Sequence, residues 1–402
     1  MLDAQTISNK PPDRDLSKSL RIALLFPTVE LGNYWQPVLK ELADISERVM
    51  LYTGRPWAGF DPNDPENIHV EVVGKTVRVN NSESKTDYSG GYMMLSPRII
   101  GRILAFKPQV VIACGFSIWT MLAIIFKPIG RWRVILAWDG SSPNVDFRNS
   151  KLRLWVRATI ARFVDRFITN SEAGKAYFCE YLGVEGQKIT VKPYLVPDPQ
   201  TLSSRLLTAT ATVDLQLPSP IFLYVGRLEE RKGVHLLLQA CHLLRQQSCQ
   251  FSLAIAGRGP QQDELQAYCH SHDLDDCVEW LGWIDYRQLG AYFQQADILV
   301  FPSLEDIWGM VTLEAMAFGK PVLASKWAGS SELIVDGQNG WLCDPHDPTA
   351  MAAQMRSAID RPALITTVGK AAAATLCEHT PQAVARFLAR VSLQSIDGNM
   401  VE

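Results

Sequence analysis

The 402-residue sequence lacks several features that mark common protein classes. Its eight cysteines include no Cys-x-x-Cys pair and lie scattered along the chain, which predicts reduced thiols in a cytosolic compartment. Residues 1–20 have no apolar core of the kind a secretory signal needs, so we expect a flexible tail there. No His, Cys and Asp residues cluster at metal-ligand spacing, and we expect neither a tightly bound metal nor a nucleic acid partner.

Long hydrophobic runs are also scarce. One run, residues 110–126 (VVIACGFSIWTMLAIIF), approaches the length needed to cross a bilayer. Its first part is rich in β-branched residues and ends at Gly115. This pattern favours a buried parallel strand followed by a helix over a membrane span.

The composition is that of a globular protein, with 47% hydrophobic and 20% charged residues, and the length predicts two or three domains. The net charge of −3 hides an asymmetry. Residues 1–200 hold 25 basic and 20 acidic residues, whereas residues 201–402 hold 14 and 22. The basic excess suits an anionic acceptor or a peripheral contact with an anionic membrane at its inner face, and it equally suits a solvated face without a partner.

Short β-branched runs alternate with helical stretches from Arg21 onward and again from Ile221 onward. This alternation predicts an α/β protein with two doubly wound, Rossmann-like domains. A Pro- and Ser/Thr-rich stretch separates the two halves and predicts a linker. The expected organisation is a flexible tail at 1–20, an N-terminal domain at 21–199, a linker at 200–218, a C-terminal domain at 219–379, and a helix and tail at 380–402 that pack back on the N-terminal domain.

Two segments of the second half predict a binding site for a diphosphate. In VGRLEERKG a strand ends at two cations, Arg227 and Lys232, which can either neutralise a diphosphate leaving group or pair with the neighbouring acids in a surface turn. In PSLEDIWGMVTLEAMAFG a helix begins near Met310, where unpaired amides form an anion site. Asp306 before this helix is either a sugar contact or an N-cap, and Glu314 on it is either a ribose contact or an exposed charge.

These segments, together with AGRGP at 256–260 and WAGSSELIVDGQNGWL from residue 327, resemble glycosyltransferase family 4, the retaining nucleotide-sugar transferases with the GT-B fold. The family usually has Glu at the position of Asp306. The resemblance implies a donor site made of Gly32, Gly226, Arg227, Lys232, Gly257, Arg258, Trp283, Asp306, Gly309, Met310, Val311 and Glu314. It assigns catalytic roles to Arg227, Lys232 and Asp306.

The first half resembles the family less closely. The family often places a histidine after the strand that here reads RVILAW, but the only histidine of this half is His69, and Asp139 takes the place. Asp139 is therefore our candidate to bind the sugar or to accept the acceptor's proton, and an Asp-Gly turn without a chemical role is the alternative. Asn170 and Ser171 match a cleft-facing strand end on the acceptor side, and they also suit an ordinary helix N-cap.

The resemblance implies a retaining hexosyltransferase that uses a UDP-, GDP- or ADP-sugar as donor substrate, and a glycan, lipid-linked or small-molecule acceptor. A non-catalytic sugar-nucleotide-binding or regulatory protein of the same fold is the alternative. The glycine fingerprint of dinucleotide-dependent oxidoreductases fails at GRGPQQ, from Gly257 onward. The basic stretch at 148–167 (RNSKLRLWVRATIARFVDRF) predicts a helix that either lies on a membrane or packs its apolar face on the sheet with solvated arginines.

Overall fold

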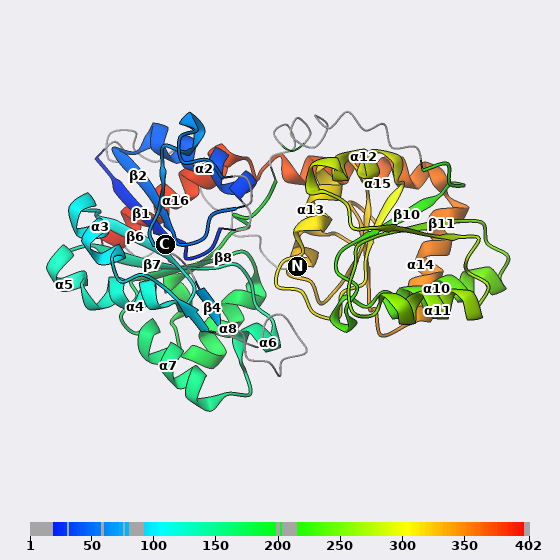
Figure 1. The fold of residues 1–402 in the computed structure, drawn as a ribbon, viewed down its shortest axis with the longest axis horizontal. Helices are drawn as coiled ribbons and strands as arrows, with labels where there is room; N and C mark the ends of the chain where they lie inside the picture. Colours follow the sequence, from blue (N-terminus) through cyan, green and yellow to red (C-terminus); the bar gives the residue numbers. More distant parts are fainter. Residues whose placement is uncertain are drawn as a thin grey trace.

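The computed structural model describes residues 19–29, 32–57, 60–74, 77–79, 92–197, 202 and 215–397. The predicted N-terminal tail, apart from its last two residues, lies outside these ranges, as does most of the predicted linker. The described residues form two parallel sheets with helices packed around them, one in each half of the chain (Figure 1). The predicted fold class is therefore confirmed, whereas the exact domain boundaries stay a proposal.

The first sheet has seven parallel strands in the order β3-β2-β1-β6-β7-β8-β9. Their bounds are Val70–Val72 (β3), Arg48–Thr53 (β2), Arg21–Leu25 (β1), Val110–Cys114 (β6), Arg133–Trp138 (β7), Arg166–Thr169 (β8) and Ile189–Val191 (β9). The central strands are almost fully buried because helices cover both faces of a parallel sheet. A separate antiparallel hairpin joins β4 (Val77–Val79) to β5 (Tyr92–Met94).

Helices cover both faces of the first sheet. They are α2 (Gly32–Ile45), α3 (Ile99–Phe106), α4 (Ile118–Ile125), α5 (Lys127–Gly130), α6 (Pro143–Asp146), α7 (Lys151–Ala161) and α8 (Glu172–Leu182). Two short 3₁₀ turns, η1 (Pro65–Asn67) and η2 (Gly186–Lys188), complete this half. Local sequence explains where α8 begins and ends, because Ser171 accepts from the Gly174 amide at its start and Gly183 adopts a left-handed conformation at its end.

The second sheet has six parallel strands in the order β12-β11-β10-β13-β14-β15. Their bounds are Val278–Gly282 (β12), Ser252–Ala256 (β11), Ile221–Val225 (β10), Ile298–Phe301 (β13), Val322–Ser325 (β14) and Trp341–Cys343 (β15). Around it lie α10 (Val234–Gln246), α11 (Gln262–Ser271), α12 (Leu289–Gln295), α13 (Met310–Ala317), α14 (Pro348–Asp360) and α15 (Pro362–Leu376), with the 3₁₀ turns η3 (Glu230–Lys232), η4 (Tyr286–Gln288) and η5 (Gly329–Leu333).

The last helix, α16 (Pro381–Asp397), crosses from the second half of the chain to the first and packs against α2 and strands β6 and β7 (Figure 1). Its side chains Val384, Leu388 and Val391 are buried. Gln382 donates to Glu41 of α2 over 2.7 Å. This helix therefore ties the two halves together on the side of the first sheet that α2 covers.

The apolar run at 110–126 forms strand β6 and helix α4, as its sequence pattern predicts. Ser117 caps α4 by accepting from the Thr120 amide. Among the described residues, no helix combines the length and hydropathy that a membrane span requires.

Candidate donor and catalytic site

The carboxyl ends of three neighbouring strands bring predicted donor residues together. The Gly226 amide donates to the Ala256 carbonyl over 3.0 Å, and the Gly257 amide donates to the Gly282 carbonyl over 2.7 Å. Arg258 and Trp283 follow these turns and are exposed. Because ligands of open parallel sheets bind at this edge, the turns after β10, β11 and β12 lie where a donor would be expected.

Lys232 pairs with Asp306. Its Nζ atom lies 2.5 Å from Asp306 Oδ2, and the two side chains are almost buried. Lys232 belongs to η3, the turn after β10, and Asp306 to the segment between β13 and α13. The two predicted residues thus come from separate turns and form one ion pair at the carboxyl edge of the second sheet.

Further ion pairs connect the Lys232–Asp306 pair to Arg227. Arg231 Nε lies 2.6 Å from Glu229 Oε1, and Arg231 Nη1 lies 3.9 Å from Asp306 Oδ2. Arg227 Nε lies 3.4 Å from the other Glu229 oxygen, and the Arg227 side chain is more than half exposed. The cluster brings three cations, Arg227, Arg231 and Lys232, to the carboxyl edge of the second sheet. Arg227 pairs with a neighbouring acid, as the surface-turn alternative expected, yet it stays within reach of solvent.

Helix α13 begins at Met310, after a glycine that the backbone requires. Gly309 has a φ of +87°, and a Cβ atom there would lie 2.9 Å from both the Phe301 ring and Ser330 Oγ. Among the described residues no side chain caps this helix start, so its first amides, those of Met310 and Val311, are available to an anion. Asp306 is therefore not the N-cap; it accepts from the Trp308 amide over 3.2 Å instead.

Buried hydroxyl groups around the start of α13 lack partners. Within the described ranges, the hydroxyls of Ser303, Thr312 and Ser330 are buried and make no hydrogen bond. Ser303 follows β13, Thr312 lies in the first turn of α13, and Ser330 lies beside Gly309. Because buried polar groups are normally paired, this concentration marks a place where a polar ligand would complete the hydrogen bonding.

Glu314 is buried in α13, so the alternative of an exposed helical charge is wrong. Its Oε1 atom accepts a short hydrogen bond from Tyr34 of α2 and a 2.9 Å bond from Tyr286 of η4. The two tyrosine hydroxyls also lie 3.1 Å apart. Burial raises the pKa of Glu314, and the two hydrogen bonds act in the opposite direction. Glu314 therefore lies where side chains from both domains meet.

Asp139 lies at the end of β7, in a turn that touches the donor side. A Cβ atom on Gly140 would lie 2.2 Å from the Ile307 carbonyl oxygen, so only glycine allows this approach between the two domains. The Asp139 carboxylate accepts from the Tyr194 hydroxyl over 2.9 Å, and its second oxygen lies 4.0 Å from the Cys114 sulfur. Burial raises the pKa of Asp139, and the bond from Tyr194 partly opposes that shift. A carboxylate of raised pKa suits a base.

The raised pKa of Asp139 predicts how stability changes with pH. The folded chain holds the Asp139 proton more tightly than the unfolded chain, so the contribution of this group is fully present below the ordinary value of 3.8 and is lost as pH rises through the folded value. Asp139→Asn carries no titrating proton. We therefore expect the melting temperature of the variant, relative to that of the wild type, to rise as pH increases from about 4 to about 8. A difference in melting temperature that does not change with pH would contradict this reasoning.

The predicted acceptor-side residues make bonds within their own domain. Asn170 Oδ1 accepts from the Tyr194 and Leu195 amides over 2.7 and 3.1 Å, and its Nδ2 donates to the Asp139 carbonyl over 2.8 Å. Ser171 is the N-cap of α8. Asn170 thus holds the Asp139 turn in place, and a direct contact of Asn170 or Ser171 with an acceptor stays a prediction. Gly32 is the first residue of α2.

Several bonds join the two domains around this cleft. Glu332 of η5 accepts from the amides of Glu172 and Ala173, at the start of α8, over 2.7 and 3.1 Å. Glu305 accepts from the Asn144 amide over 3.0 Å. Trp308 Nε1 donates to the Leu195 carbonyl over 2.7 Å. These contacts hold the two domains together along the cleft.

We expect Glu332→Ala to weaken the contact between the two domains, so that they lie farther apart on average. Two amides at the start of α8 would lose their acceptor, and a lost cap costs about 0.5–2 kcal/mol. Small-angle X-ray scattering should show a larger radius of gyration for Glu332→Ala than for the wild type. Glu172→Gln is the matched control, because it changes an exposed side chain beside the same amides. Superimposable scattering curves for all three proteins would refute a role of Glu332 in closure.

Four residues that support the site were not predicted from the sequence. Tyr34 and Tyr286 hold Glu314, Tyr194 holds Asp139, and Glu332 caps a helix of the other domain. Each contact joins residues that are distant in the chain, so no local pattern predicts the pairing. The available signals were weak ones: Tyr34 is two residues from Gly32, and Glu332 lies inside the quoted segment that begins at Trp327.

Known proteins resemble the second half of the chain in sequence. Residues 211–375 match the family model described as glycosyl transferases group 1. The glycogen synthase of Mycobacterium tuberculosis is 38% identical over 177 residues, which are 44% of this chain and 43% of that protein. The D-inositol 3-phosphate glycosyltransferase of Pseudarthrobacter chlorophenolicus is 32% identical over 221 residues, 53% of this chain and 52% of that protein. These matches span about half the length of the curated relatives.

Solved structures resemble the chain over nearly its whole length. HepE of Anabaena in complex with UDP has a TM-score of 0.69 at 21% identity, and the match covers 94% of this chain and 100% of that one. Sucrose-phosphate synthase from Thermosynechococcus elongatus has a TM-score of 0.68 at 20% identity with the same coverage. At these identities the likeness establishes the fold alone. The chain therefore has the two-domain GT-B fold, and residues 211–375 of its second half match the glycosyl transferases group 1 model.

Proposed function

We propose that the chain is a retaining glycosyltransferase that moves a hexose from a nucleotide-diphosphate sugar to an acceptor hydroxyl. The observation that carries this proposal is the ion pair of Lys232 and Asp306, which lies beside Arg231 and before the uncapped start of α13. Cations and free amides that converge at one edge of a parallel sheet suit a diphosphate. Retention and the hexose rest on the family resemblance.

In the proposed reaction the nucleoside diphosphate leaves while the acceptor oxygen bonds to the anomeric carbon. Negative charge grows on the leaving phosphate, and fixed cations and amides directed at it lower the barrier more than they tighten substrate binding. An ammonium group has three donor hydrogens, so Lys232 can keep its bond to Asp306 while it donates to a phosphate oxygen. Asp306 would then hold Lys232 in position and contact the sugar.

The acceptor hydroxyl would enter from the N-terminal domain, beside Asp139. The Asp139 turn touches Ile307 of the donor side, so a group held at Asp139 is close to the α13 start. A carboxylate there can accept the proton that the acceptor hydroxyl loses. This role favours an enzyme over a non-catalytic sugar-nucleotide binder. A glycan or lipid-linked acceptor is proposed from the relatives named in polysaccharide assembly, such as the putative colanic acid biosynthesis glycosyltransferase WcaL of Salmonella typhimurium.

The donor is tested by thermal shift against UDP-, GDP- and ADP-sugars, since a true donor raises the melting temperature with its concentration. UDP-glucose is the first candidate, because HepE was solved in complex with it. A flat response to every nucleotide sugar would refute the proposal. Release of nucleotide is then measured with acceptors in the wild type and in Asp139→Ala. Donor binding without release in the wild type would identify a non-catalytic binder.

A further inference from the structure

Helix α7 has an inverted arrangement of side chains. Leu152 and Trp155 lie three positions apart on α7, Phe163 lies two residues beyond its end, and all three side chains are exposed. Arg157 points inward instead, where it donates to the Val145 and Asp146 carbonyls and to the Tyr177 hydroxyl over 2.8–3.1 Å. The alternative that α7 packs its apolar face on the sheet with solvated arginines therefore holds for Leu154, which packs on a hydrophobic cluster, but is wrong for Trp155, Phe163 and Arg157.

The neighbouring helices continue this surface. Ile125 ends α4, Ile129 lies on α5, and both are exposed. Helices α4 and α7 share a hydrophobic cluster that includes Ile124, Leu154 and Ala158. Figure 1 shows α4, α5 and α7 on the side of the sheet away from α2 and α16. We call the exposed set the apolar face; its members are 57 to 71% exposed and comprise Ile125, Ile129, Leu152, Trp155 and Phe163.

Positive charge surrounds the apolar face. Residues 115–133 and 147–164, which form it, contain three and five basic residues respectively and no acidic residue. Five of these cations are exposed: Arg131, Arg133, Lys151, Arg153 and Arg162. A patch of exposed Trp, Phe, Leu and Ile with basic residues at its edges is the pattern of a protein that lies on an anionic bilayer.

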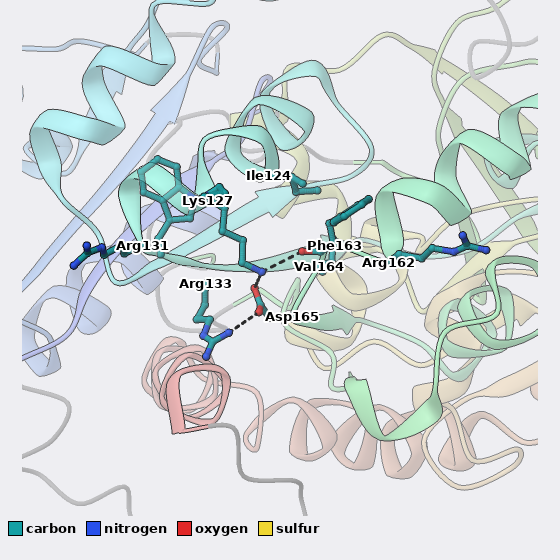
Figure 2. A pocket seen from close by; sticks show the side chains of 10 residues that line it. Ile124, Lys127, Arg131, Arg133, Arg162, Phe163, Val164 and Asp165 are labelled. Atoms are coloured by element: carbon teal, nitrogen blue, oxygen red, sulfur yellow. Dashed lines mark hydrogen bonds and ion pairs between the residues drawn. The ribbon is translucent and has the colours of Figure 1, made fainter.

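A basic pocket lies at one end of the apolar face, between α5 and the end of α7 (Figure 2). It has a volume of about 580 Å³, and its lining includes Lys127, Arg133, Phe163 and Asp165. Lys127 Nζ donates to Asp165 over 2.6 Å and to the Phe163 carbonyl over 3.2 Å, and Arg133 lies 3.1 Å from Asp165. Arg131 and Arg162 line it as well and extend to opposite sides in Figure 2, so the pocket and its rim hold four cations against one acid.

We propose that the apolar face docks the chain on an anionic lipid bilayer. Trp155, Leu152 and Phe163 would enter the boundary between headgroups and acyl chains, while the exposed cations contact lipid phosphates. The basic pocket would take an anionic headgroup. Charge complementarity favours a bilayer, because Arg131, Lys151, Arg153 and Arg162 form no ion pair with any described residue and phospholipid headgroups supply matching anions.

The position of α7 determines how a docked chain would place the cleft between its domains relative to the membrane. Helix α7 follows α6, whose Asn144 bonds to Glu305 of the other domain, so the apolar face runs from the basic pocket toward the cleft. A docked chain would hold its cleft near the membrane surface. This orientation suits a lipid-linked acceptor. The choice of acceptor rests on the proposed function, whereas docking on the bilayer does not depend on that function.

The test is co-sedimentation of the purified chain with vesicles of phosphatidylcholine alone and of equal parts phosphatidylcholine and phosphatidylglycerol. We expect the wild type to bind the mixed vesicles, less so at high salt, and to bind neutral vesicles weakly. Leu152→Ser/Trp155→Ser should bind the mixed vesicles about tenfold more weakly, since binding scales with buried apolar area. Ile68→Ser is the matched control, because Ile68 and Leu152 are both 71% exposed and Ile68 lies outside the apolar face. It should bind as the wild type does.

A second double variant keeps the test valid if Leu152→Ser/Trp155→Ser misfolds. Arg131→Glu/Lys151→Glu leaves the apolar side chains intact and should weaken binding to mixed vesicles at low salt, with an unchanged melting temperature. The proposal is overturned if the wild type does not bind the mixed vesicles, or if both double variants bind them as well as the wild type. It is equally overturned if sedimentation velocity shows a wild-type dimer that Leu152→Ser/Trp155→Ser dissociates, because the apolar face would then join two copies of the chain.

Discussion

Replacement of Lys232 by methionine is expected to slow nucleotide release from the donor about 10²- to 10³-fold, the usual loss when one fixed donor to a developing charge is removed. Lys232 Nζ lies 2.5 Å from Asp306 Oδ2, and the side chain is almost buried. The ammonium group is therefore held in position before a donor binds. Methionine has a similar length and no charge. The measurement is the initial rate of nucleoside diphosphate release at saturating donor.

The Lys232 variant needs a control for folding, since it leaves the buried Asp306 without its closest cation. Lys232→Met/Asp306→Asn removes both charges and should restore the melting temperature without restoring the rate. Arg245→Met removes an ion pair with Asp276 elsewhere in the same domain and should keep the wild-type rate. A folded Lys232→Met protein with the wild-type rate would show that the leaving phosphate does not depend on this cation.

Replacement of Glu314 by glutamine is expected to weaken nucleotide binding about 10- to 100-fold, because a hydrogen bond to a charged group contributes about 1.5–3 kcal/mol. In the proposed complex the Glu314 carboxylate accepts from ribose hydroxyls. Its Oε1 atom already accepts from Tyr34 and Tyr286. A ribose hydroxyl would therefore compete with a tyrosine hydroxyl, and calorimetric titration with the nucleoside diphosphate measures the outcome.

Tyr34→Phe distinguishes a role of Glu314 in nucleotide binding from a role in the contact between the two domains. It removes one competing hydroxyl while keeping the ring, so we expect nucleotide affinity to stay equal to that of the wild type or to increase. Glu279→Gln, an exposed change on β12, should leave affinity unchanged. If Glu314→Gln binds nucleotide as tightly as the wild type, then Glu314 only joins the two domains and does not contact the ribose.

Much of the fold was predictable because it depends on local patterns. Buried parallel strands such as β6 and β10 are short apolar runs that a glycine follows, and helices come after them in the sequence. The same logic placed Lys232 and Asp306 at one sheet edge, because the carboxyl ends of parallel strands always share an edge. Their ion pair connects residues 74 positions apart, and the strand order alone brings those two turns together.

The remaining features depend on tertiary contacts that no local pattern encodes. The burial of Glu314 follows from Tyr34, which belongs to the other domain and lies 280 residues away. The inward direction of Arg157 depends on carbonyl groups at the end of α6 and on Tyr177 of α8. Sequence spacing alone could not say which face of α7 meets the sheet, since Leu, Trp and Arg residues alternate around this helix.

A crystal structure of the chain with a bound nucleoside diphosphate tests most directly whether Lys232, Arg227 and the start of α13 bind the diphosphate. We expect the diphosphate at the α13 start, with phosphate oxygens within hydrogen-bond distance of Lys232 Nζ and the Val311 amide and with the Arg227 guanidinium turned toward them. A diphosphate bound elsewhere, with Lys232 still bonded to Asp306 alone and Arg227 directed to solvent, would contradict it.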